Sequence, residues 1–85
     1  MSTMKQEVDV VTIFNRGSRQ PKPIKFRLIE KGETLTVDVF DVLSFDYIGQ
    51  NRIDYECNAL SKKGNLIKYI LEYYRNEGRW ILNME

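Results

Sequence analysis

Apolar and polar side chains alternate with a period of two residues along much of this chain of 85 residues. The clearest alternation covers residues 52–59, where the apolar positions are Ile53, Tyr55, Cys57 and Ala59. The same alternation, or a run of β-branched residues, marks four further segments: residues 8–14, 24–29, 34–39 and 79–84. A period of two is typical of a strand that buries one face. The pattern therefore predicts a strand in each of these five segments.

Two other segments allow more than one interpretation. In "NLIKYILEYYRNEG", residues 65–78, apolar side chains fall both at strand spacing and at helical spacing. We favour a strand over residues 66–74, with a helix as the alternative, because isoleucine and tyrosine are enriched in strands. The Asn-Glu-Gly that follows then predicts a hairpin to the last strand. The segment "FDVLSFDYIG", residues 40–49, fits either a bent strand or a strand that contains one helical turn.

Turn-forming residues, chiefly glycine, proline and asparagine, separate these segments at intervals of roughly 15 residues. Short strands divided by such turns predict an all-β fold. We expect a small antiparallel barrel or a strongly curled sheet of five to six strands, of the size of SH3-like or OB-like barrels. The whole chain, residues 1–85, is expected to form a single domain, with a flexible N-terminus over residues 1–6.

The composition argues against the commonest catalytic and metal-binding chemistry. The chain has no histidine and one cysteine, Cys57, which the alternation places in the core. Zinc sites need several Cys or His ligands, and phosphate loops need clustered glycines, whereas the five glycines here are scattered over turns. We therefore expect no enzyme activity, no catalytic residue, no metal, no cofactor and no small-molecule substrate. The absence of a signal peptide and of a long apolar run predicts a cytoplasmic protein that is not associated with membranes.

The net charge is +1, but the charges are distributed unevenly along the chain. Residues 1–31 hold seven Lys or Arg against three acidic residues, whereas residues 32–60 hold six acidic residues against one Arg. Lys and Arg neutralise phosphates, and exposed aromatic rings stack on bases. The first functional hypothesis is therefore a non-catalytic module that binds nucleic acid through the basic stretch "FNRGSRQPKPIKFRL", residues 14–28. Its candidate binding residues are Arg16, Arg19, Lys22, Lys25, Arg27 and Tyr74.

Lys25 and Arg27 are the most testable residues of this hypothesis, because a strand fixes the direction in which they point. If the lysines within residues 62–68 lie beside them, the cations form a binding face. If acidic residues such as Asp38 or Glu56 face them instead, the cations are cross-strand partners.

The alternative hypothesis is a protein-interaction module or accessory subunit, including a homodimer. Its binding surface is expected on the strand faces opposite the predicted core, where an exposed apolar strip would indicate a partner. The candidate residues of this strip are Ile29, Phe40, Ile70, Tyr74 and Ile81.

Short motifs along the chain also resemble a known pattern. They are "IKFRL" at residues 24–28, Gly49-x-Asn51-Arg52, Tyr55-x-Cys57, Leu71-x-Tyr73 and Arg79-Trp80. With this order, GxNR…YxC…LxY…RW, the chain resembles a group of short, uncharacterised all-β bacterial proteins. The resemblance implies an all-β fold with a strand over residues 66–74, and it implies no activity.

Overall fold

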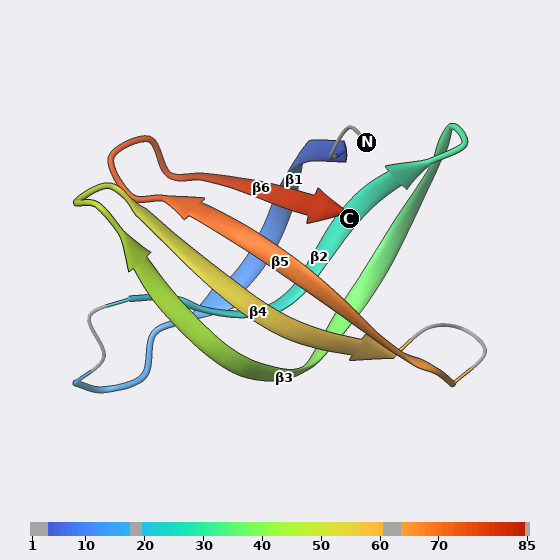
Figure 1. The fold of residues 1–85 in the computed structure, drawn as a ribbon. Helices are drawn as coiled ribbons and strands as arrows, with labels where there is room; N and C mark the ends of the chain where they lie inside the picture. The colour runs from blue at the N-terminus through green and yellow to red at the C-terminus, as the bar shows by residue number, and fades with distance from the viewer. Residues whose placement is uncertain (1–3, 18–19, 61–63, 85) are drawn as a thin grey trace.

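Six strands follow one another along the chain and close into a barrel (Figure 1). The computed structural model describes residues 4–17, 20–60 and 64–84. The strands are β1 (Met4–Ile13), β2 (Lys22–Glu30), β3 (Glu33–Ile48), β4 (Arg52–Leu60), β5 (Leu66–Tyr74) and β6 (Arg79–Met84). Each strand pairs with the next in antiparallel orientation, and β6 pairs with β1 to complete the ring. The predicted all-β fold, a small antiparallel barrel, is confirmed.

The apolar faces identified by the alternation fill the interior of the barrel. On β4, four inward-facing residues are buried: Ile53, Tyr55, Cys57 and Ala59. Other strands add Val8, Phe26, Leu28, Leu71, Trp80 and Leu82 to this core. The Trp80 ring stacks on Tyr73 with 4.6 Å between centroids, and it lies 5.4 Å from the ring of Tyr55. The prediction that Cys57 belongs to the core is therefore confirmed.

Both ambiguous segments are strands. β5 pairs with β4 along its whole length, so the preferred interpretation of residues 66–74 is confirmed and the helix is excluded. Residues 40–48 form the second half of β3, which is a strand of 16 residues. Figure 1 shows that β3 curves along the side of the barrel, so the bent strand rather than the helical turn is the correct alternative.

Two β-bulges explain why the alternation fails along β3. They insert Phe40 and Leu43 into the strand without partners on β4. Val39, Val42 and Phe45 consequently lie opposite buried residues of β4, at a spacing of three residues rather than two. An extra residue in one strand of a pair bends that strand and increases its twist. The curvature of β3 therefore coincides with the place where its sequence pattern is irregular.

The N-terminal strand begins earlier than the sequence pattern suggests. A flexible N-terminus was expected over residues 1–6, and the structure places Met4, Lys5 and Gln6 in β1, paired with β6. Residues 1–3 lie outside the described part of the chain. The side-chain amide of Gln6 donates to the carbonyl oxygen of Ile29 at 2.9 Å and accepts from its backbone N–H at 2.7 Å. These two bonds connect β1 to β2 at the point where the ladder of β1 passes from β2 to β6.

Candidate functional site

Acidic residues face the two cations of β2 on which the nucleic-acid hypothesis most depends. The Arg27 guanidinium donates to the Asp9 carboxylate of β1 at 2.7 Å. Lys25 lies opposite Asp38 of β3 in the ladder. The structure thus places Lys25 and Arg27 across from acids, which is the arrangement expected of cross-strand partners. Nucleic-acid binding through these two cations stays a prediction.

The other predicted nucleic-acid contacts are spread over the molecule. Arg16 is exposed in the loop after β1, and Lys22 is exposed at the start of β2. Arg19 lies outside the described residues. Tyr74 is half-buried at the end of β5, where its hydroxyl donates to the Glu72 carboxylate at 3.0 Å. β5 and β2 are not neighbours in the barrel, so the sheet does not bring Tyr74 beside the cations of β2.

The acidic residues fall into two groups according to their partners. Outside β3, every carboxylate whose side chain the structure describes forms an ion pair. These pairs are Glu7 and Glu77 with Arg79, Asp9 with Arg27, Asp54 with Arg52, Glu56 with Lys68, and Glu72 with Lys5. β3 carries four exposed carboxylates, none of which pairs with a cation in the described part of the chain. These β3 carboxylates are Glu33, Asp38, Asp41 and Asp46.

β2 and β3 diverge beyond their last ladder pair, Lys25 with Asp38. Toward its start β2 pairs with β1, and from residue 39 onward β3 pairs with β4. Among the described residues, no strand therefore lies along the second side of β3 over residues 39–48. We call this side the free edge of β3. Both bulges fall within it, so the bend of the strand and the loss of the β2 partner occur together.

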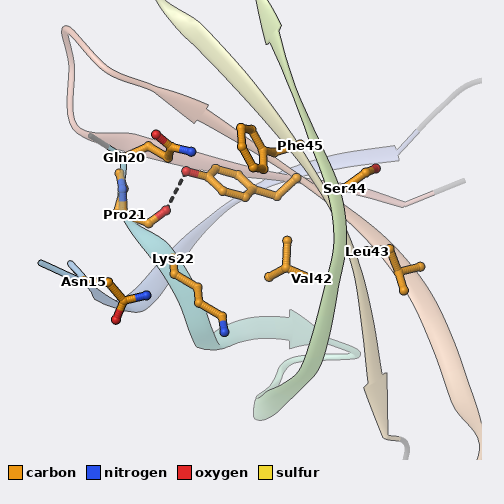
Figure 2. Close-up of a pocket in the computed structure, with 9 residues that line it drawn as sticks. Asn15, Gln20, Pro21, Lys22, Val42, Leu43, Ser44 and Phe45 are labelled. Atoms are coloured by element: carbon orange, nitrogen blue, oxygen red, sulfur yellow. Dashed lines mark hydrogen bonds between the residues drawn. The ribbon is translucent and has the colours of Figure 1, made fainter. Parts of the chain in front are cut away.

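A groove of about 510 Å³ lies between the free edge of β3 and the segment that leads into β2 (Figure 2). β3 contributes residues 42–45 to its lining, the facing segment contributes residues 20–22, and Tyr55 reaches it from β4. Figure 2 shows Val42 pointing toward the side of the groove that holds Lys22, while Leu43 points to the opposite side of β3. The lining is thus a mixture of apolar side chains and a few polar groups, which is usual for a binding site.

Two tyrosine hydroxyls connect the walls of the groove. Tyr55, which is buried, donates to the carbonyl oxygen of Pro21 at 2.5 Å. Tyr47 of β3 donates to the Gln20 side chain at 3.0 Å. Burial raises the pKa of Tyr55, with smaller contributions from neighbouring tyrosines, so its phenol remains a protonated donor. These bonds fix the segment that leads into β2 relative to β3 and β4.

Large apolar side chains are exposed along β3 beside this groove. Phe40 is 65 % exposed and Tyr47 is 52 % exposed, and Leu43, Phe45 and Ile48 are each nearly half exposed. The carboxylates of Asp41 and Asp46 alternate with them along the strand. The free edge of β3 is therefore lined by apolar and acidic side chains together.

The predicted apolar strip is exposed only in part. Ile29 and Phe40 are exposed, whereas Ile70, Tyr74 and Ile81 are half-buried. Sequence reasoning missed most of the exposed apolar residues of β3, although one signal was present. Residues 40–48 are apolar on both faces of a strand, which is more than one buried face requires.

The described residues offer little for covalent or metal chemistry. Burial, followed by the nearby Asp41 and Glu56, raises the pKa of the Cys57 thiol to about 12, so the reactive thiolate is disfavoured. No group of three or more His, Cys, Asp or Glu within the described ranges is placed to hold a metal ion. The described part of the chain also contains no helix long and apolar enough to cross a membrane. No protein-family model, curated protein or solved structure matches the chain.

Proposed function

We propose that the chain is a non-catalytic binding module for other polypeptides, and that the groove and the free edge of β3 form its binding surface. One observation carries this proposal: large apolar side chains, including Phe40, Phe45 and Tyr47, are exposed along a strand whose second side has no described partner. Open strand edges and contiguous exposed apolar patches are typical of interaction sites.

The charges beside the groove favour a polypeptide over nucleic acid. The β3 carboxylates lie next to the exposed apolar residues, and carboxylates repel the phosphates of DNA and RNA. A polypeptide can bring both apolar side chains and cations to such a surface. Of the cations of β2, Arg27 is paired with Asp9, Lys25 lies opposite Asp38, and Lys22 alone lines the groove.

Photo-crosslinking in cells tests the proposal. A benzophenone amino acid replaces Phe40 in one variant and Thr36 in the control variant. Both residues are exposed on β3, but Thr36 lies where β3 is paired with β2, opposite Arg27. We expect covalent adducts to proteins from position 40 and far fewer from position 36. Equal adduct formation at both positions, or adducts that nuclease digestion removes, would contradict the proposal.

A further inference from the structure

The free edge of β3 has the features of a strand that accepts another strand. Over residues 39–48 its second side presents backbone N–H and C=O groups that no described strand pairs. Such groups always require a hydrogen-bond partner, which is either water or another chain. Lysine, proline and β-bulges commonly protect natural strand edges from pairing. The 16 residues of β3 include no Lys, Arg or Pro, and its two bulges are the protective feature that it does have.

The groove lies between the free edge of β3 and the segment that leads into β2. Its two walls are connected through the side chains of Tyr47 and Tyr55, which bond to residues 20–21. An extended segment in this position would direct alternate side chains toward Val42 and Phe45, which line the groove.

The β3 carboxylates indicate which side chains the remaining positions of that segment carry. Asp41 and Asp46 flank the groove-lining residues 42–45 along the strand. Lys22, the cation in the lining, forms no ion pair with them among the described contacts. Lys or Arg on an added strand would provide the cross-strand partners that these carboxylates lack, and opposite charges across a strand pair are stabilising.

A second copy of this chain fits the free edge less well than a basic partner does. Pairing β3 with β3 brings Asp41 and Asp46 from both copies into one interface. Neither strand contributes a cation, because β3 contains no Lys or Arg. Like charges across a strand pair are destabilising. The charge of β3 therefore favours a different polypeptide.

We propose that the free edge of β3 binds, as an added strand, an extended segment of a partner protein in which Lys or Arg alternates with apolar residues. Main-chain hydrogen bonds to β3 provide affinity, and the groove and the β3 carboxylates provide selectivity. This inference rests on the proposed function and adds the mode of binding and the chemistry of the partner.

Fluorescence anisotropy with labelled synthetic peptides tests the inference on the whole chain. The probe alternates lysine and valine over about nine residues, which is an ordinary strand length. One control peptide alternates glutamate and valine. A second control carries proline in place of the central valine of the probe, which removes a donor from the ladder. We expect the lysine–valine peptide to bind about tenfold more tightly than either control.

Substitutions of two kinds of carboxylate locate the site. The double variant Asp41→Asn/Asp46→Asn removes the charges beside the free edge, and Glu33→Gln removes an equally unpaired carboxylate where β3 is still paired with β2. Exposed ion pairs contribute modestly, so we expect the double variant to weaken lysine–valine binding about three- to tenfold and Glu33→Gln to weaken it less than about twofold. Added salt should also weaken binding of the lysine–valine peptide to the native chain, because salt screens the charges of exposed groups. Hydrogen exchange of the amides in residues 39–48 should become slower when the lysine–valine peptide is bound.

Equal affinity for the lysine–valine and glutamate–valine peptides, or for the proline peptide, would overturn the inference. A dimer in light scattering that Phe40→Ser dissociates would also overturn it, because a second copy would then occupy the edge. If one of these results is obtained but position 40 still forms protein adducts, the proposed function remains supported and only binding by strand addition is excluded. The absence of protein adducts from position 40 would remove both.

Discussion

Glu72 is a buried carboxylate in the wall of the barrel, with only 1 % of its side chain exposed. Its oxygens accept hydrogen bonds from the Lys5 ammonium at 3.4 Å, the Tyr74 hydroxyl at 3.0 Å and the Asn83 amide at 3.2 Å. These partners come from β1, β5 and β6, so the carboxylate connects the N-terminal strand to the closing strands of the barrel. We predict that Glu72→Ala lowers the free energy of unfolding by about 3 kcal/mol.

The magnitude follows from what each partner of Glu72 loses. Asn83 loses its acceptor, and because its Oδ1 is already buried without a hydrogen-bond partner, leaving the amide unsatisfied costs about 1–3 kcal/mol. Lys5 is 47 % exposed, so its ammonium regains water and loses less than the roughly 3–5 kcal/mol of a fully buried pair. The lost bond from Tyr74 adds about 1 kcal/mol. A loss of about 3 kcal/mol in a domain of this size corresponds to a fall in Tm of roughly 12–24 °C.

Urea unfolding followed by the fluorescence of Trp80, which is buried in the core, measures this change. Glu77→Ala is the matched control, because Glu77 is half exposed and pairs only loosely with Arg79, at 3.8 Å. The control should change the free energy of unfolding by less than about 1 kcal/mol. If Glu72→Ala has no larger effect than this control, the reasoning about the buried network is refuted.

The same carboxylate should make stability depend on pH in the acid range. Burial raises the pKa of Glu72, but hydrogen bonds from Lys5 and Tyr74, together with the charges of Lys5 and Arg52, lower it below the ordinary value of 4.5. A folded-state pKa below the unfolded one means that ionised Glu72 stabilises the fold fully above pH 4.5, and that this contribution is lost as the pH falls through the folded-state value. The difference in unfolding free energy between the native chain and Glu72→Gln should therefore be largest near neutral pH and shrink in acid. A difference that stays constant as the pH falls would refute the linkage.

Three smaller changes test other parts of the barrel. Tyr55→Phe removes the donor to the Pro21 carbonyl and should lower the free energy of unfolding in urea by about 1–2 kcal/mol; an unchanged value would mean that this bond contributes nothing. Cys57 is fully buried with a thiol pKa of about 12, so a thiol reagent should label it only as fast as the barrel opens; immediate labelling of the native chain would contradict its packing. Arg27→Ala removes an exposed ion pair with Asp9 and should change the free energy of thermal unfolding by less than about 1 kcal/mol; a larger loss would show a structural role that its exposure does not predict.

Local patterning was sufficient to predict the strands that bury one regular face. β4 alternates without interruption, and its inward residues, such as Ile53 and Tyr55, are buried in the structure. The choice of a strand for β5 also depended on local information, because β-branched and aromatic side chains suit a pleated surface. The beginning of β1 was not predictable in this way. Polar residues such as Lys5 and Gln6 resemble a loose terminus until their partners on other strands are known.

The free edge of β3 was beyond sequence reasoning for a physical reason. A bulge changes the relation between sequence spacing and strand face, so Phe40 and Leu43 break the period of two without any local turn signal. Whether a strand has neighbours on both sides depends on the register of strands that are distant along the chain. Here the β2–β3 ladder ends at Lys25 and Asp38, although both strands continue beyond that pair. The candidate groove exists because β3 continues for ten residues, 39–48, beyond its last pair with β2.

The excess negative charge of the middle of the sequence is located on one strand of the folded chain. The acidic stretch, residues 32–60, forms β3 and β4, and both carboxylates of β4 are paired, Asp54 with Arg52 and Glu56 with Lys68. The surplus negative charge of this stretch therefore resides on β3. The basic first third contributes Lys5 and Arg27 to ion pairs, whereas Arg16 and Lys22 are exposed and have no described ion pair. The net charge of the strand residues that lack a described ion pair is negative, and the carboxylates that carry it lie along β3, close to exposed apolar side chains. This charge is one reason why we propose a cationic polypeptide as the partner.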